Sequence, residues 1–221
     1  MKRLCLSFFV LFSISLLVSC AADHKIRYND TVADLSVSGG KNAAVAVHDQ
    51  RPYIVSGEST PDYVGLNRAG GSLVPFKPHH VKTESGKSLA DDMSESIRNS
   101  LAAKGLAIFP VKTAASEDKN TILARMKETK AERLVLFTVY EWQSDTYINT
   151  GLYYDTKLEI FDIAGSKLTE KTLKGEDNIA RSESMWSPEL SIEGMKVVIP
   201  KVFKAKIETL FNDKDVVEAL R

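Results

Sequence analysis

The dipeptide His48-Asp49 contains the residue types that a proton-transfer site would need. A histidine base oriented by a carboxylate is the usual arrangement in hydrolases. Here the two residues are adjacent in a run that is expected to be extended, and adjacent side chains of a strand point to opposite faces. No nucleophile motif of the form G-x-S-x-G accompanies them. We therefore predict no catalytic residues, and a protein that is not an enzyme.

Asp49 and Arg51 are two positions apart, so they share one face of an extended chain. A carboxylate and a guanidinium at this spacing are expected to form a local salt bridge that shapes the loop after the strand.

The histidines do not have the spacing of a metal site such as H-E-x-x-H, and paired C-x-x-C motifs are absent. The four histidines are His24, His48, His79 and His80. Gly70-Gly71 is not followed by the lysine of a phosphate-binding loop. We expect no metal, no nucleotide and no dissociable cofactor.

The first segment of the chain has the order of a secretory signal peptide. Lys2 and Arg3 precede the apolar run LCLSFFVLFSISLLV, residues 4–18. A spanning helix needs about 20 apolar residues, so this run is too short to be one. The only cysteines are Cys5 and Cys20, and Cys5 would leave with the signal peptide. The mature chain would keep one cysteine, which excludes an internal disulfide.

The residues LVSC, 17–20, resemble the bacterial lipobox. This resemblance implies cleavage between Ser19 and Cys20, a diacylglycerol on the Cys20 sulfur and acylation of the new amino terminus. Each buried methylene contributes about 0.8 kcal/mol, so two or three chains anchor a protein firmly. Position 21 is Ala rather than Asp, which by the sorting rule of enteric lipoproteins implies the periplasmic leaflet of the outer membrane.

Charge and length limit the partners of the mature chain. There are 29 basic and 29 acidic residues in all. A balanced surface argues against nucleic acid or anionic lipid as the main ligand, since those select clustered Lys and Arg. The length suffices for one domain with its own core.

We divide the chain into residues 1–19 as signal peptide, 20–42 as acylated terminus and flexible tether, and 43–221 as a single periplasmic domain. Residues 20–42 are polar and end at Gly39-Gly40. A short edge strand over residues 32–37 remains the alternative to a plain tether.

The domain begins with strand–helix–strand–helix. AAVAVHD, 43–49, predicts a buried strand, and LAIFPV, 106–111, a second one. Between them, Ser88 is expected to cap a helix whose apolar side chains recur every four residues. A further helix is expected after a Ser116 cap, with Ile122, Leu123 and Met126 inward. This order implies at least two parallel strands.

Alternating segments follow at 132–147, 150–165 and 166–180, and predict an antiparallel meander of two long strands and a shorter one. A final helix is expected after Ser187-Pro188, split or kinked at Pro200. Its apolar stripe is Ile192, Met195, Ile199, Phe203, Ile207 and Leu210. The predicted fold class is α+β, with a mixed sheet covered by helices and a C-terminal amphipathic helix.

The connection 51–87 contains five glycines and four prolines, yet also several large apolar residues. Loops of this length are uncommon in compact domains and tend to be either functional or disordered. Disordered segments are usually poor in aromatic residues, so an ordered segment, or one that orders against a partner, is favoured. We predict a partner-binding surface on this loop and the strand end before it. Its candidate residues are Asp49, Arg51, Tyr53, Tyr63, Leu66 and Phe76. The alternative is that these side chains cover an edge of the core.

Aromatic residues gather at the far end of the meander and before the last helix: Tyr140, Trp142, Tyr147, Tyr153, Tyr154 and Trp186. Aromatic side chains with one polar end favour interfaces. They equally suit the roof of a sheet beneath the last helix, and both interpretations stay open.

The order of lipobox, polar segment, strand ending in DQRP (49–52), Gly-rich segment, helix ending in LAAKGL (101–106), strand and hairpin resembles the YajG-type periplasmic lipoproteins. It is similar to the amino-terminal domain of TolB and, more distantly, to CsgG. The resemblance covers residues 20–175 and implies an envelope location and this fold. A membrane pore is not expected, because charged residues such as Asp145 and Lys157 flank the hairpin turn.

These observations predict a lipid-anchored, non-enzymatic binding or assembly module at the periplasmic face of the outer membrane. Its expected partners are the membrane, through the lipid, and an envelope protein or a second copy of the chain, but no nucleic acid. The alternative is an auxiliary lipoprotein of a lipid or ligand transport system, which needs a groove lined by the loop and the last helix. A hydrolase would depend on His48 and Asp49 alone.

Overall fold

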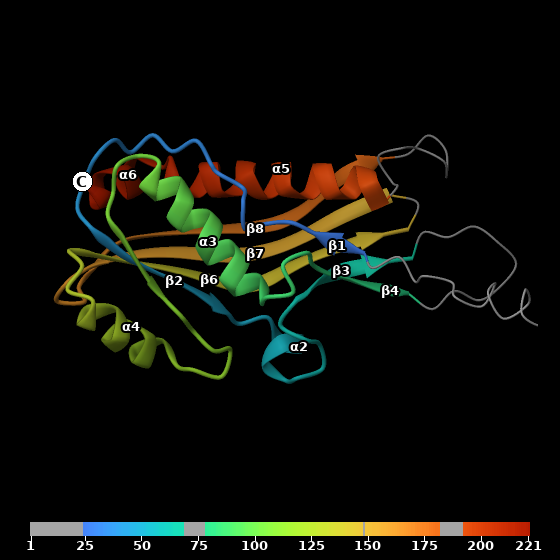
Figure 1. Cartoon of the computed structure of the whole chain (residues 1–221), viewed down its shortest axis with the longest axis horizontal. Coiled ribbons are helices and arrows are strands. Elements are labelled where there is room, and N and C mark those ends of the chain that lie inside the picture. The colour runs from blue at the N-terminus through green and yellow to red at the C-terminus, as the bar shows by residue number, and fades with distance from the viewer. Residues whose placement is uncertain (1–23, 69–77, 148, 182–191) are drawn as a thin grey trace, which may run out of the picture.

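The computed structural model describes residues 24–68, 78–147, 149–181 and 192–221. In these residues eight strands form one mixed sheet, with five helices around it (Figure 1). The predicted α+β class is confirmed. None of the described helices is both long and apolar enough to cross a membrane.

The central strand is β6 (Arg133–Thr146). Along one edge it pairs in parallel with β2 (Ala43–Asp49) and, further on, with β3 (Tyr63–Asn67). The strand β5 (Ile108–Val111) lies parallel to β2 on the outside. The predicted strand at 43–49 and the parallel pairing are thus confirmed.

Beyond β3 come β4 (His79–Thr83), which is antiparallel to it, and β1 (Lys25–Ile26). On the other edge of β6, β7 (Asn149–Asp162) and β8 (Lys167–Arg181) form the antiparallel meander. The prediction of a shorter third strand is wrong, because β8 has 15 residues against 14 in each of the others. Its side chains alternate between exposed and half-buried, so its hydrophobic signal is weak.

The helix α3 (Leu89–Ala102) begins at the predicted cap, since Ser88 Oγ accepts from the Asp91 N–H at 3.0 Å. The helix α4 (Lys119–Glu128) is capped by Asp118 and not by the predicted Ser116. The Asp118 carboxylate accepts from two backbone N–H groups and also carries the negative charge that a helix N-terminus favours.

The helices α5 (Ile192–Phe211) and α6 (Lys214–Leu220) end the chain. The α5 helix passes through Pro200 as one helix, so the predicted split is wrong. A proline inside a helix costs about 3 kcal/mol. Buried side chains on both sides of the proline, such as Ile199 and Phe203, hold the helix on the sheet and offset that cost. Trp186, Ser187 and Pro188 lie outside the described residues.

Each face of the sheet has its own hydrophobic core. We call the face covered by α3 and α5 the inner face; its core includes Val45, Phe137 and Leu158. The opposite, outer face packs against α4, through residues such as Leu136 and Phe161. Figure 1 shows α5 along the upper side of the sheet and α4 below it.

The segment 24–42 belongs to the domain, so the prediction of a flexible tether from 20 to 42 is wrong for these residues. It contributes β1 and then runs across the inner-face core, without forming a strand at 32–37. Its buried apolar side chains are Ile26, Tyr28, Ala33, Leu35 and Val37. Backbone N–H groups of Asp34 and Ser36 donate to Glu208 and Asn212 at the end of α5. The domain therefore includes residues 24–42 and does not begin at Ala43.

The connection 51–87 is not one long loop in its described parts. It contains α2 (Pro52–Val55) and the two strands β3 and β4. A side chain at Gly65 would collide with the backbone and Oγ of Ser144 in β6. Glycine therefore allows β3 to approach β6 closely enough to pair. The same glycine weakens the strand signal in the sequence, so the segment was predicted to be part of a loop.

Candidate binding surface on the outer face of the sheet

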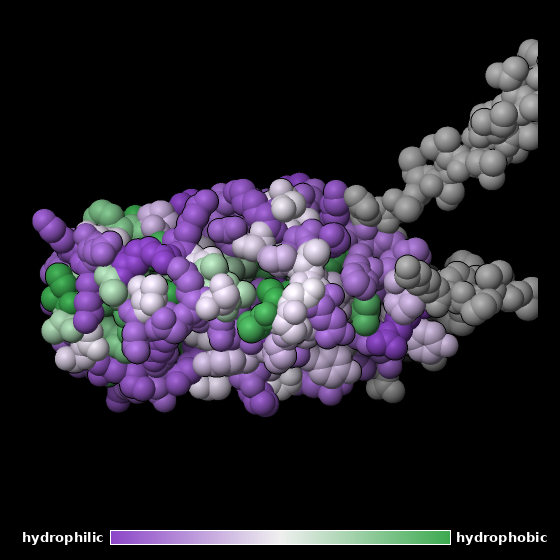
Figure 2. Space-filling model, turned by 90° about the horizontal axis from the view of Figure 1, so that it is seen from below, coloured by the Kyte–Doolittle hydropathy of each residue, from purple (hydrophilic) through white to green (hydrophobic). Residues whose placement is uncertain are grey.

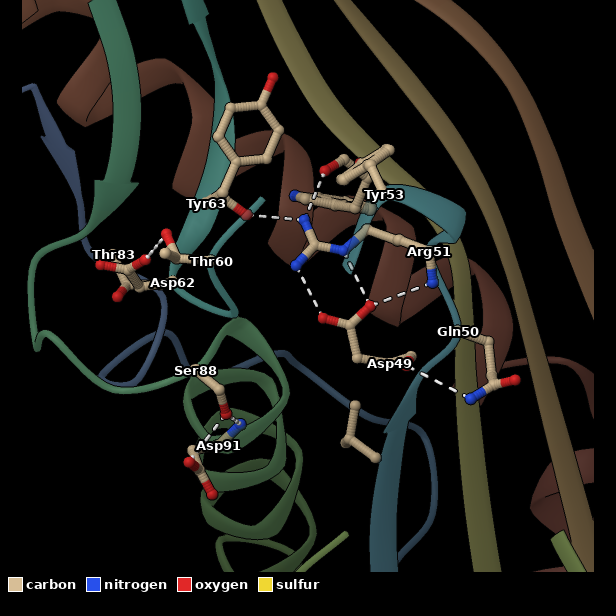
Figure 3. Close-up of polar contacts among 12 residues, drawn as sticks. Asp49, Gln50, Arg51, Tyr53, Thr60, Asp62, Tyr63, Thr83, Ser88 and Asp91 are labelled. Atoms are coloured by element: carbon tan, nitrogen blue, oxygen red, sulfur yellow. Dashed lines mark hydrogen bonds and ion pairs between the residues drawn. The ribbon is translucent and has the colours of Figure 1, made fainter. Parts of the chain in front are cut away.

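The guanidinium of Arg51 joins three strands at the carboxyl end of β2 (Figure 3). Its Nε and Nη2 donate to the two carboxylate oxygens of Asp49 at 2.9 and 2.7 Å. Its Nη1 donates to the main-chain carbonyls of Tyr63 in β3, at 2.7 Å, and Trp142 in β6, at 3.2 Å. We call this arrangement the Arg51 clamp. The planar guanidinium can donate to the carboxylate through two nitrogens and to the carbonyls through the third, which a lysine ammonium could not do in this geometry.

The Arg51 clamp is closed to a partner, because Arg51 and Asp49 are 0% and 5% exposed. The predicted local salt bridge is confirmed. The inclusion of these two residues in a partner-binding surface is corrected: their charges are satisfied inside the protein, where they fix the connection from β2 to β3.

The tyrosines of the same set lie beside the clamp. The Tyr53 hydroxyl donates to Glu141 Oε1 at 2.6 Å, and its ring meets that of Tyr63 edge to face at 5.5 Å. Tyr63 in turn packs edge to face on His80, and burial raises its pKa to about 12. Tyr63 is 4% exposed, so for this residue the structure favours the alternative that it covers the core.

Tyr53 and Leu66 are half-buried. Phe76 lies outside the described residues, as do Ser19 and Cys20.

His48 does not form a catalytic pair with Asp49. The imidazole Nε2 lies 2.7 Å from Nε2 of Gln50, whose amide also donates to the Ala115 carbonyl. Burial lowers the pKa of His48, which keeps the ring neutral at pH 7. Within the described residues, no three side chains of metal-ligating type come together either.

The aromatic cluster of the meander divides between the two faces. Trp142 is buried beneath α5, where its ring meets Phe203 edge to face at 5.6 Å, as the roof interpretation predicts. Tyr140, Tyr147 and Tyr153 are instead 43%, 65% and 39% exposed. These three tyrosines keep the interface interpretation open.

A hollow of about 470 Å³ lies at the tip of the β6–β7 hairpin, on the outer face beyond α4. We call it the outer hollow. It is lined by Arg68, Asp145, Tyr147, Asn149, Gly151, Tyr153, Glu176 and Asn178. Figure 2 views the molecule from below and shows a largely hydrophilic surface on which hydrophobic residues form small separate patches. Because its lining combines charged and amide side chains with two tyrosine rings, the hollow is suited to a polar ligand with some apolar surface.

The outer hollow contains a tyrosine ring packed beside a glycine, and an ion pair. Atoms of the Tyr153 ring lie 3.5 to 3.7 Å from where a Cβ of Gly151 would be, so the ring lies beside the bare backbone. Arg68 Nη2 donates to Asp145 Oδ2 at 2.7 Å. The Glu176 carboxylate faces Tyr153 across the ladder and raises the pKa of its phenol.

Sequence reasoning identified only the tyrosines of this surface. Arg68, Gly151 and Glu176 were missed, because they meet only through strand pairing between β3, β6, β7 and β8. The alternation in residues 149–155 and 174–178 places Tyr153 and Glu176 on polar faces, but the register that joins them cannot be read from either segment alone.

The described residues thus form an α+β domain with a polar hollow on the outer face of its sheet. No protein-family model matches the chain, and no curated protein matches it.

Several solved structures are similar to the chain at low sequence identity. Protein XCC0632 from Xanthomonas campestris is 12% identical with a TM-score of 0.48, over 88% of this chain and 96% of that one. The PelC dodecamer from Paraburkholderia phytofirmans is 19% identical with a TM-score of 0.38, over 79% and 91%. Lipoprotein GNA1162 from Neisseria meningitidis is 11% identical with a TM-score of 0.36, over 77% and 99%.

Proposed function

We propose that the protein is a lipoprotein of the bacterial envelope, anchored through Cys20 in the periplasmic leaflet of the outer membrane. It binds an envelope protein through the outer face of its sheet and catalyses no reaction. The anchor is supported by the LVSC sequence at 17–20 and by the signal-like run before it.

The observation that supports binding is the exposure of Tyr147 and Tyr153 around the outer hollow. Large aromatic side chains with a polar end are the most frequent anchors of protein interfaces. These two rings do not belong to the inner-face core, whereas Trp142 and Tyr154 are buried in that core.

A transport role for lipid receives no such support. The described cavity next to α5 is bounded by Met195 and Ile199 and has a volume of about 20 Å³. This is room for about one water molecule and not for an acyl chain.

Crosslinking in living cells tests the proposal. A photoreactive amino acid replaces Tyr147 in the full chain, and matched variants carry it at Ile163 and Val197, which are exposed at 48% and 53%. We expect a discrete crosslinked protein from position 147 and none from the two controls. The same products from all three positions, or no product from position 147, would refute binding through the outer hollow.

A further inference from the structure

Two tyrosines of this protein already hold a cation beside a carboxylate. On the inner face, Lys206 Nζ lies 4.0 Å from the ring centroid of Tyr154 and 2.5 Å from Asp177 Oδ2, and the Tyr154 hydroxyl donates to Asp177 Oδ1 at 3.2 Å. In the Arg51 clamp, the guanidinium lies 5.4 Å from the Tyr53 ring. The negative face of an aromatic ring and a carboxylate attract a cation together.

The outer hollow has the aromatic ring and the carboxylate of this arrangement on the same two strands, β7 and β8. Tyr153 and Glu176 are direct partners in the β7–β8 ladder, one residue away from Tyr154 and Asp177 and therefore on the opposite face. On the inner face, α5 brings Lys206 to the pair. The salt bridges and ring contacts seen between described side chains include none that joins a lysine or arginine to Glu176 or Tyr153, and the side chain of Arg181 is outside this description.

The charges around the outer hollow favour a cation. Its lining contains one basic side chain, Arg68, and two carboxylates, Asp145 and Glu176. Because Arg68 pairs with Asp145, the unpaired charge among these groups is that of Glu176. The ring of Tyr147, 65% exposed, provides a second aromatic surface at the same hollow.

We propose that the outer hollow receives a lysine or arginine side chain of the protein partner, with the cation between Tyr153 and Glu176. This inference rests on the proposed function and specifies the chemistry of the partner: a basic side chain on an exposed segment. The bound cation would complete on the outer face the arrangement that Lys206 completes on the inner face.

The test is binding of a fluorescently labelled tetra-arginine peptide to the full chain in a neutral detergent, measured by anisotropy at low salt. A tetra-citrulline peptide has the same shape without the charge and is the ligand control. We expect saturable binding of the arginine peptide only. Glu176→Gln should weaken it about tenfold, and Tyr153→Leu about three- to fivefold, while Tyr153→Phe keeps the ring and most of the affinity.

Glu58→Gln is the matched protein control, because it removes one negative charge from an exposed loop residue away from the outer hollow. Circular dichroism melts establish that every variant is folded. Absence of saturable binding, equal binding of the citrulline peptide, or an equal loss in Glu58→Gln would overturn the proposal.

Arg181 needs a separate variant, since its backbone lies opposite Asn149 at the end of β8. If Arg181→Gln increases the affinity tenfold or more, the chain supplies the cation itself and the proposal is wrong. An unchanged affinity supports it.

This test and the crosslinking experiment can fail independently. Crosslinks from position 147 without peptide binding would preserve partner binding and exclude a cationic side chain as its basis. Peptide binding without crosslinks would show a cation site that no envelope protein uses.

Discussion

Asp92 is a buried carboxylate whose ionisation opposes folding, so Asp92→Asn should remove a penalty that the protein carries at neutral pH and not at pH 4. The side chain lies on α3 and is fully buried. Its Oδ1 accepts from Ser85 Oγ at 2.7 Å, whereas no described residue donates a hydrogen bond to Oδ2. Burial is the main cause that raises its pKa from 3.8 to about 6, with smaller contributions from Asp91 and Glu95, against Ser85 and Lys87.

The sign follows from proton binding. Between about pH 4 and pH 6 the folded protein holds this proton and the unfolded chain does not, so the free energy of unfolding falls as pH rises. A shift of roughly two pKa units at 1.36 kcal/mol per unit is worth about 3 kcal/mol. Below about pH 4 Asp92 is protonated in both states and does not lower the free energy of unfolding. Above about pH 7 it is ionised in both states, and the free energy of unfolding is lowered by the full amount.

Asparagine keeps an acceptor for Ser85 and removes the charge. It also buries an N–H without a partner, which costs about 1–3 kcal/mol at every pH. The reliable quantity is therefore the difference between two conditions. The change in unfolding free energy caused by Asp92→Asn should be more favourable at pH 8 than at pH 4 by about 2–3 kcal/mol.

Urea unfolding followed by circular dichroism, on the chain from Ala21 onward, measures both values. Glu58→Gln controls for the loss of a negative charge at an exposed position. An Asp92→Asn effect that is the same at pH 4 and pH 8, or more destabilising at pH 8, would show that folding does not raise the pKa of Asp92.

Three further changes test the clamp, the β3 strand and the anchor. Arg51→Met should destabilise the fold by about 3–5 kcal/mol in urea unfolding, because it leaves the Asp49 carboxylate buried and unpaired; a loss below 1 kcal/mol would contradict the clamp. Gly65→Ala should cost about 1–3 kcal/mol through collision with Ser144, whereas Gly151→Ala, whose Cβ has room, should cost less in the same assay. Cys20→Ser should leave the protein unprocessed or outside the membrane fraction, since the acylated sulfur is gone; normal fractionation and normal intact mass would exclude lipid attachment at Cys20.

A regular local pattern predicted two elements where the structure has them. The strand 43–49 is a continuous apolar run buried on both faces, and the helix from Leu89 buries one face. The segment 24–42 lacks such a regular pattern, although Ala33, Leu35 and Val37 alternate and are buried. Their burial depends on α5, about 170 residues away, which supplies Glu208 and Asn212 to the backbone of the segment. Contacts of such separation are not encoded in local sequence.

The candidate site, too, could be predicted from the sequence only in part. Spacing alone predicted the Asp49–Arg51 salt bridge, because both residues belong to one extended segment. Spacing could not indicate that the pair is buried, because Arg51 also donates to carbonyls of β3 and β6, which are distant in the sequence. Nor could it join Tyr153 to Glu176, since their contact requires the register of β7 against β8.

The packing of residues 24–42 also changes where the proposed partner must be. If Cys20 carries the lipid, the four residue steps from Cys20 to His24 span at most about 14 Å. His24 and Lys25 line one small cavity together with Asn67 and Thr146, which are adjacent in the sequence to Arg68 and Asp145 of the outer hollow. Figure 1 shows β1 beside β3 and β4 at that end of the sheet. A short linker at that end holds the hollow close to the membrane surface, whereas a 23-residue tether would have allowed it to reach far into the periplasm. The partner should therefore expose its basic side chain near the lipid headgroups.

Ten Gly and Ser residues inserted after Asp23 should reduce crosslinking from position 147, because a longer linker lowers the effective concentration of the hollow at the membrane surface. Undiminished crosslinking would show that the partner is not confined to the membrane surface.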